Sequence, residues 1–370
     1  MAIAMVLLHH YIFQFHPSMP EALAALLLPV AQLGWSGVDL FFILSGFLIG
    51  GILVEARESD SYYSTFYTRR AFRILPIYFL LVAGGIGLSL LAAHGTAITQ
   101  VFALRPAPWA YYITFTQNFY FSQHAEMIWY LQVTWSLAVE EQFYLTLPLL
   151  VRNVSKERLL GIAVGLAVCC ALLRTILYWK GSLTPMQCYT LPFFRFDSLF
   201  IGVACAMLMK DGSWAERLSK HSRTLAVSVA VFGAAFLLMD HNLWTRNLAL
   251  HTVGFTVIAL FYAAAMLFVL VRPASTAARA LGFRPLIRLG TISYCVYLIH
   301  GLVLLAAELI LKPVLGLSEV ESWLVVFVGF VATILLAQLS WTLFESRIIA
   351  LGHRFHYEAG NPPRNVPQSV

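Results

Sequence analysis

Ionisable side chains occur inside long apolar stretches of this sequence, where such groups are costly and therefore rare. Imidazoles and carboxylates in such places can accept, donate or relay protons. These residues are the first candidates for a site that does chemistry. They are His9, His10, Asp39, Glu140, Glu141, Arg195, Asp197, His300, Glu308 and Glu345.

Two adjacent histidines, His9 and His10, lie in the middle of the first apolar stretch. A neutral imidazole can take a proton from an alcohol near neutral pH, as a general base must. Successive helical residues point about 100° apart, so we expect at most one of the two to face a given site. The alternative is a hydrogen-bonded packing histidine. No cluster of further ligands at matched spacing indicates a metal site.

Asp39 lies in a run of apolar and small residues from Gly37 to Gly50, towards the outer end of its predicted span. Its carboxylate can orient an imidazole or bind a hydroxyl; the alternative is a helix cap or a structural hydrogen bond. In the same run, Gly46 and Gly50 form a small-xxx-small pair, which predicts close approach of another helix.

Three arginines, Arg69, Arg70 and Arg73, lie at the predicted cytoplasmic mouth of the third apolar stretch. Arg73 shares a helix face with Arg69 (i, i+4) and with Arg70 (i, i+3). Guanidinium groups bind phosphate through paired, charge-assisted hydrogen bonds, so this cluster suits a phosphate group. The alternative is that the three side chains snorkel to the membrane surface and report orientation.

Two adjacent glutamates, Glu140 and Glu141, belong to the densest motif, Trp135 to Leu145. We expect them to open a membrane span, because the N-terminus of a helix favours negative charge. One of the two is expected to contribute to an inner cavity, since adjacent carboxylates are hard to explain by packing.

Further polar side chains lie on the sixth, ninth and tenth predicted spans. Arg195 and Asp197 can pair with neighbouring helices rather than with each other, and a structural role is an equal alternative. Tyr297 and His300 add polar groups to the ninth span, and Glu345 ends the tenth.

The composition indicates the class of protein that positions these side chains. Of the 370 residues 60% are hydrophobic and 11% are charged, whereas an average soluble domain has roughly 25% charged residues. This excludes an ordinary soluble enzyme, a disulfide-stapled scaffold and a disordered chain. The five cysteines are expected to pack in helices. We predict an all-α polytopic membrane protein.

About ten apolar segments are long enough to be spans. Eighteen of the 24 basic residues fall in one alternating set of connections, which the positive-inside rule makes cytoplasmic. Both termini are then cytoplasmic, and the net charge of +6 reports orientation and not nucleic acid. A membrane domain covers 1–350 and a polar cytoplasmic tail 351–370. Between spans, the aromatic stretch 105–134 is expected to be interfacial or re-entrant. The segments are 1–16, 33–53, 73–93, 137–152, 158–178, 194–210, 223–240, 247–271, 287–311 and 322–345.

These motifs together resemble the membrane acyltransferase family 3, the bacterial O-acyltransferases of surface polysaccharides and related acceptors. The resemblance covers nearly the whole chain. Its specific parts are Gly37 to Ile49 and Trp135 to Leu145; the others are Leu8 to His10, Arg69 to Pro76, Arg195 to Leu199, Tyr294 to His300, and Phe344 with Glu345.

The resemblance implies transfer of an acyl group, usually acetyl from acetyl-CoA, to a hydroxyl. The donor is then cytoplasmic, and the acceptor is an envelope glycan or glycolipid presented from the outer side of a bacterial inner membrane. By similarity His10 takes the role of the motif histidine, the arginines hold the coenzyme A phosphates, and Glu345 is the carboxylate near the C-terminus. Membrane lipids are expected partners; a metal and nucleic acid are not.

One departure from the family concerns the start of the chain. Members usually carry an Arg or Lys on the N-terminal side of the histidine, separated from it by ten residues, and this position falls before Met1. We expect an upstream in-frame extension to supply it; the alternative is a member without that residue.

The residues support a mechanism in which His10 deprotonates the acceptor hydroxyl, while Asp39 or Glu345 fixes its tautomer. Direct transfer and an acyl-histidine intermediate both fit. The competing function is a proton-coupled transporter or exporter, since buried His and Glu residues suit a proton relay. The sequence has no visible inverted repeat, and the arginine cluster suits a nucleotide-like cofactor better.

Overall fold

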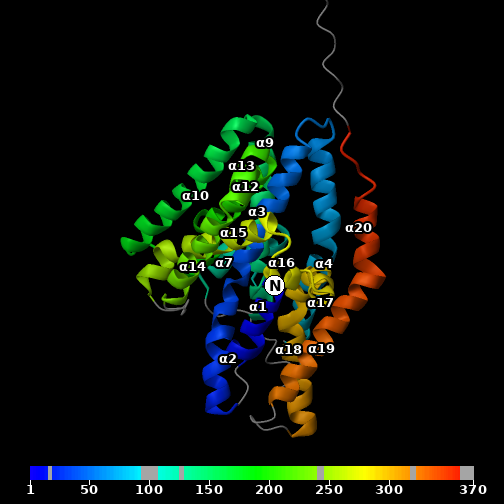
Figure 1. Cartoon of the computed structure of the whole chain (residues 1–370). Coiled ribbons are helices and arrows are strands. Elements are labelled where there is room, and N and C mark those ends of the chain that lie inside the picture. Colours follow the sequence, from blue (N-terminus) through cyan, green and yellow to red (C-terminus); the bar gives the residue numbers. More distant parts are fainter. Residues whose placement is uncertain (16–18, 93–106, 125–128, 240–245, 317–321, 359–370) are drawn as a thin grey trace, which may run out of the picture.

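The computed structural model describes residues 1–15, 19–92, 107–124, 129–239, 246–316 and 322–358, and within these ranges every regular element is a helix. The longer helices form the body of the molecule (Figure 1). They are α2 (Glu21–Leu33), α3 (Gly37–Glu55), α4 (Tyr62–Ala92), α9 (Thr134–Asn153), α10 (Lys156–Trp179), α12 (Phe196–Lys210), α14 (Ser222–Leu237), α15 (Phe255–Val271), α18 (Ser293–Leu315) and α19 (Ser322–Ser340).

Shorter helices join or extend these. Three of them, η1, η4 and η6, are π-helical continuations of α-helices, a form often found at functional sites. The short helices are α1 (Ala2–Leu8), η1 (His9–Gln14), η2 (Gly34–Ser36), α6 (Trp109–Ile113), α7 (Gln117–Phe121), α8 (Trp129–Gln132), α11 (Pro185–Thr190), η3 (Pro192–Phe194), α13 (Gly212–Lys220), η4 (Leu250–Gly254), α16 (Thr276–Leu281), α17 (Arg284–Thr291), η6 (Trp341–Glu345) and α20 (Ser346–Gly352).

Six helices of the described chain are long and apolar enough to cross a membrane. A helix lies in each of the ten predicted segments, but several are short: Ala2–Gln14 and Ser222–Leu237 have fewer than 18 residues. The number of ten crossings and the cytoplasmic termini therefore stay predictions. The six are Glu21–Glu55, Tyr62–Leu88, Lys156–Trp179, Leu250–Val271, Ser293–Leu315 and Trp323–Gly352.

The aromatic stretch predicted to be interfacial falls partly on 93–106 and 125–128, outside the described residues, as does the end of the polar tail beyond 358. Its described part consists of the short helices α6, α7 and α8. Trp109 is exposed, whereas Tyr112 and Phe121 are buried. These short helices thus expose one aromatic side chain and bury two others, as expected for an interfacial segment.

Helices α3 and α12 cross in direct backbone contact, and glycines make this possible. A Cβ on Gly46 would lie 2.0 Å from the carbonyl oxygen of Leu199, and one on Gly202 would lie 2.3 Å from that of Ile43. Gly50 packs on Val203 of the same partner. The close approach predicted for the Gly46/Gly50 pair is thereby confirmed, with α12 as the partner.

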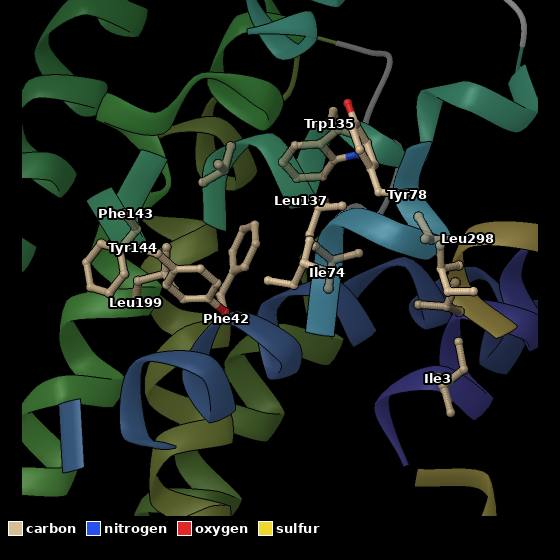
Figure 2. Close-up of a cluster of buried hydrophobic side chains, with 14 of the residues drawn as sticks. Ile3, Phe42, Ile74, Tyr78, Trp135, Leu137, Phe143, Tyr144, Leu199 and Leu298 are labelled. Atoms are coloured by element: carbon tan, nitrogen blue, oxygen red, sulfur yellow. The ribbon is translucent and has the colours of Figure 1, made fainter. Parts of the chain in front are cut away.

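Two buried clusters pack on the two sides of α3. The larger joins residues of α1, α3, α4, α9, α12 and α18, and Figure 2 shows part of it, with Phe42, Ile74, Trp135, Leu199 and Leu298. The smaller gathers α12, α14 and α15 residues around Trp35 and Ile43. In Figure 1, α4, α19 and α20 lie on one side of this core, and α10 and α14 on the other.

Candidate active site

A cavity of about 250 Å³ lies where η1, α2, α9, α11 and α18 meet. Both His9 and His10 line it, together with aromatic side chains and side-chain amides. The expectation that only one of the two histidines faces a given site is wrong, because the α-helix changes to a π-helix at His9 and the cavity extends across this turn. Other lining residues are Gln32, Gln132, Trp35, Trp135, Tyr189 and Tyr297.

His10 is held by its own helix. Its Nδ1–H donates to the carbonyl oxygen of Val6 at 2.9 Å. A carbonyl only accepts hydrogen bonds, so Nδ1 carries the proton and Nε2 keeps its lone pair. This is the tautomer that a general base needs. The predicted partner for this nitrogen, a carboxylate from Asp39 or Glu345, is wrong, because a backbone carbonyl occupies its place.

His9 also lines the cavity and is held by contacts with α2 and with its own helix. Its Nδ1 bonds to the carbonyl oxygen of Ala31 on α2 at 3.2 Å, and its ring stacks on Phe13 with centroids 5.3 Å apart. His9 is only 6% exposed. These contacts tie η1 to α2 and leave His10 as the more accessible of the two imidazoles.

His300 of α18 packs directly against His10, with ring centroids 4.7 Å apart. Its Nδ1–H donates to the carbonyl oxygen of Tyr297 at 2.7 Å. Its Nε2 is fully buried and has no hydrogen-bond partner among the described residues. Two histidines distant in sequence thus meet ring against ring beside the cavity.

Tyr297 completes this side of the cavity. Its hydroxyl lies 2.9 Å from the carbonyl oxygen of Val133 and 2.7 Å from Oγ of Ser136. Val133 is the N-cap of α9, and Ser136 lies in its first turn. The pair therefore fixes α18 against α9 and holds one wall of the cavity at a set position.

Asp39, Arg195 and Asp197 form a separate, fully buried network with Arg174. Arg195 bonds to Asp39 at 2.6 Å, and Arg174 bonds to Asp197 at 2.9 Å. All four side chains are inaccessible to solvent. The prediction that Arg195 and Asp197 pair with neighbouring helices and not with each other is confirmed. None of the four lines the cavity, which places Asp39 away from the imidazole that it was predicted to orient.

The network packs against the aromatic wall of the cavity. The Arg195 guanidinium lies over Phe255 at 4.3 Å and over Tyr189 at 5.4 Å. Tyr189 in turn packs on Trp135 with ring centroids 4.5 Å apart, and both rings line the cavity. Such cation–π contacts strengthen when they are shielded from water.

A second pocket, of about 100 Å³, is lined by all three predicted phosphate-binding arginines, Arg69, Arg70 and Arg73. His353 and Tyr357, which follow α20, form another part of its wall. The two cavities lie at opposite ends of α3, since Val38 lines the first and Ile52 lines the second. Fourteen residues of helix separate these positions by about 21 Å.

Glu140 and Glu141 lie between the two cavities and line neither. The Glu140 carboxylate accepts hydrogen bonds from the hydroxyls of Ser45 and Tyr144 and interacts electrostatically with Arg70. The expectation that the glutamates open their helix is wrong, because α9 already begins at Thr134. Arg70 interacts electrostatically with both glutamates.

Glu345 belongs to the same charged region. It accepts a hydrogen bond from Ser340 Oγ at 2.8 Å and interacts electrostatically with Arg73. Glu308 is paired with Lys312 at 3.0 Å on the surface of α18, so it belongs to neither cavity. The candidate residues thus separate into a histidine cavity, a buried ion network and an arginine–glutamate region.

Two residues of these sites, Arg174 and Tyr357, were not predicted from the sequence. Arg174 resembles one more basic residue near a span end, yet it is buried and bonded to Asp197 and Thr256. The only available hint is that it interrupts an apolar segment. Tyr357 lies in a segment that reads as a polar tail. Within the described residues no cluster of three or more His, Cys, Asp or Glu side chains is arranged to hold a metal ion.

Comparison with known proteins assigns the family. The profile of a family described as an acyltransferase domain, the acyltransferase 3 family, matches residues 1–342. The chain belongs to this family. The match favours acyl transfer over the transporter function that the buried ionisable residues also fit.

Its relatives include proteins named for O-acetyl transfer. The chain is 30% identical over 337 residues to YrhL of Bacillus subtilis, whose name provisionally assigns it peptidoglycan O-acetyltransferase activity; the match covers 87% of this chain and 51% of YrhL. It is 28% identical over 333 residues to the peptidoglycan O-acetyltransferase OatA of Listeria monocytogenes, covering 86% and 52%. The chain spans about half the length of these relatives. No solved structure matches it.

Proposed function

We propose that the protein is an integral membrane O-acetyltransferase that moves an acetyl group from acetyl-CoA to a hydroxyl of an envelope glycan, in the inner membrane of a bacterium. The observation that carries the proposal is the pair of cavities at the two ends of α3, one lined by histidines and the other by arginines. An acyl transfer between a phosphate-bearing donor and a neutral hydroxyl needs one site of each kind.

The histidine cavity suits a sugar acceptor. Its wall combines Trp35, Trp135 and Tyr189 with the amides of Gln32 and Gln132. Aromatic faces pack on the apolar faces of a pyranose ring, and amides donate and accept hydrogen bonds with its hydroxyls. The names of the relatives, which refer to peptidoglycan, support a glycan acceptor.

The arginine pocket suits the donor. Coenzyme A carries several phosphate groups at one end and the thioester at the end of a long arm. Guanidinium groups bind such phosphates with charge-assisted hydrogen bonds. With Arg69, Arg70 and Arg73 holding the phosphates, the arm would run along α3 past Ser45 and Glu140 towards His10. Glu140 suits this intermediate position, because it interacts with Arg70 and also with Tyr297, which lines the histidine cavity.

The chemistry follows from the free Nε2 of His10. This atom takes the proton of the acceptor hydroxyl as the oxygen attacks the thioester carbonyl. The tetrahedral intermediate then collapses and releases the thiolate of coenzyme A, which takes the proton back from the imidazolium. The ring of His300, whose buried Nε2 has no hydrogen-bond partner among the described residues, lies against the imidazolium. An acyl-histidine route would use the same Nε2 as the nucleophile.

The positive-inside rule places the arginine pocket at the cytoplasmic face and the histidine cavity towards the outer face. With ten crossings, this orientation puts both termini in the cytoplasm. It also brings the donor from the compartment in which acetyl-CoA is made and the acceptor from the side on which the envelope is built.

The test is transfer of labelled acetyl groups from acetyl-CoA to glycan fragments by the purified protein in lipid nanodiscs. Mass spectrometry of the fragments should detect an added acetyl group that base treatment removes as an ester. Arg70→Ala should abolish coenzyme A binding, and Arg158→Ala, a surface arginine of α10, should not. Failure of wild-type protein to bind coenzyme A or to transfer acetyl would contradict the proposed donor.

A further inference from the structure

The segment that follows α20, residues 353–358, folds back over the first turns of α4. The hydroxyls of Ser61 and Thr65 both donate to the carbonyl oxygen of His356, at 3.0 and 3.1 Å. The backbone N–H of Glu358 donates to the hydroxyl of Ser61 at 2.9 Å. This segment, which the sequence pattern assigns to a polar tail, is therefore attached to the body of the protein by several specific hydrogen bonds. We call it the C-terminal strap.

The strap also fixes Arg69. The Nε–H of Arg69 donates to the carbonyl oxygen of Phe355 at 2.8 Å, and the guanidinium lies 5.2 Å from the centre of the Tyr357 ring. The Phe355 ring packs near Phe72, with centroids 6.3 Å apart. Because Nε is occupied, Arg69 would bind a phosphate through its two terminal nitrogens. A guanidinium held in place before binding loses less side-chain entropy on contact with its ligand.

The approach of the strap depends on one glycine. A Cβ at Gly352, the last residue of α20, would lie 2.9 Å from Cβ of Phe72. The close contact between α20 and α4 places the strap beside the arginines. The pocket wall accordingly contains Arg69, Arg70, His353 and Tyr357.

Tyr357 is suited to contact an anion in this pocket. It is half-buried, and burial raises the pKa of its phenol, while the charges of Arg69 and Arg70 act in the opposite direction. The phenol stays protonated at neutral pH and can donate a hydrogen bond. Its ring supports the guanidinium of Arg69 through a cation–π contact.

We propose that the C-terminal strap is part of the donor site, with Tyr357 as a residue that binds the phosphate-bearing end of coenzyme A and positions Arg69. This inference rests on the proposed function, which assigns the donor to the arginine pocket, and it adds a binding element that lies beyond the family match at residues 1–342. The donor is then bound between α4 and the strap and not by α4 alone.

The experiment measures binding of coenzyme A and of adenosine 3′,5′-bisphosphate to the full chain in nanodiscs. Tyr357→Ala should weaken both at least tenfold, and Tyr357→Phe should lose less because it keeps the ring. The matched control is His356→Ala, whose side chain lies outside the pocket wall in the same segment, and it should stay within twofold of wild type.

A double-mutant cycle separates positioning from a general effect on folding. If Tyr357 acts on Arg69, the combined loss in Tyr357→Ala/Arg69→Ala is smaller than the product of the two single losses. A combined loss equal to that product would overturn the positioning role. Coenzyme A bound by wild type, lost in Arg70→Ala and retained in Tyr357→Ala would overturn the inference and leave the proposed function standing. No binding by wild type would overturn both.

A labelling measurement covers the case in which Tyr357→Ala does not fold. A maleimide should modify His353→Cys and His356→Cys in the absence of ligand, because both positions are exposed. Coenzyme A should slow modification at position 353 at least fivefold and leave position 356 unchanged. Peptide mass spectrometry reads each position separately from the native cysteines. Equal rates at position 353 with and without coenzyme A would contradict the inference.

Discussion

His10 is the residue at which the proposed chemistry takes place, and its neighbour His9 provides the natural comparison. His10→Ala removes the base and should lower kcat by about 10²–10⁴-fold, the usual contribution of a general base. His9→Ala removes the contacts with Ala31 and Phe13 and should lower activity by less than about tenfold. Acetyl transfer rates of the two purified variants test this, and equal losses would remove the distinction between the two imidazoles.

His300 is expected to act through His10. His300→Ala takes away the buried ring beside His10, so it should lower kcat by about 10-fold to 100-fold, less than loss of the base itself, with little change in KM for either substrate. His300→Gln, whose amide oxygen can accept a hydrogen bond, should recover part of the loss. If both variants instead raise KM for the acceptor, His300 shapes the cavity and does not assist the base.

How much of the site follows from the sequence depends on what holds each residue. The chemistry of His10 and the shared pocket of Arg69, Arg70 and Arg73 depend on residue type and helical spacing, which the sequence displays. The partner of His10 Nδ1 is a backbone carbonyl, and such a partner leaves no signature in residue types. The meeting of His10 with His300 depends on tertiary packing across 290 positions, which spacing alone cannot specify.

At the level of elements, the crossing of α3 and α12 depends on Gly46. Gly46→Val would place a side chain against the carbonyl of Leu199 and should destabilise the protein by about 3 kcal/mol or more. Gly165→Ala on α10 is the matched control, because a Cβ there meets nothing within 4 Å, and it should stabilise its helix by about 0.5–1 kcal/mol. Thermal unfolding in detergent compares the two; a tolerated Gly46→Val would contradict the backbone contact.

The ion pair between Asp39 and Arg195 connects α3 to the start of α12, and we expect its role there to be structural. Asp39→Ala leaves a buried guanidinium without its carboxylate, so it should cost about 3–5 kcal/mol of stability. Replacing both residues by apolar ones, Asp39→Leu with Arg195→Met, removes both charges and should recover most of that loss. Stability of the two variants is measured by thermal unfolding. Acetyl transfer retained by the double variant would exclude a direct catalytic role for Asp39.

The elements themselves were largely predictable, and the exceptions have physical causes. Apolar length predicts where helices lie, so each predicted segment contains one. It does not predict that α2 and η2 extend α3 to give Glu21–Glu55, because Pro29 and the glycines before Val38 read as breaks. Nor does it predict the strap, whose attachment uses the backbone carbonyls of His356 and Phe355. The polar composition of that segment indicates solvent exposure, and most of its residues are indeed exposed even though it is hydrogen-bonded to α4.

At the scale of the whole molecule, the two cavities require a fixed orientation in the membrane. The arginine pocket must open to the cytoplasm if acetyl-CoA is the donor, and the positive-inside rule independently predicts this orientation. In that orientation the connection after α10 lies outside, whereas α13 and the strap lie inside. Cysteine substitutions at Ser182, Ser219 and His356, one per variant and all at exposed positions, report on which side of the membrane these three segments lie. A membrane-impermeant maleimide added to intact cells should modify Ser182→Cys alone, and permeabilised cells should show all three modified, as read by peptide mass spectrometry. Modification of Ser219→Cys and His356→Cys in intact cells, with Ser182→Cys protected, would show the opposite orientation. The arginine pocket would then lie where cytoplasmic acetyl-CoA cannot reach it.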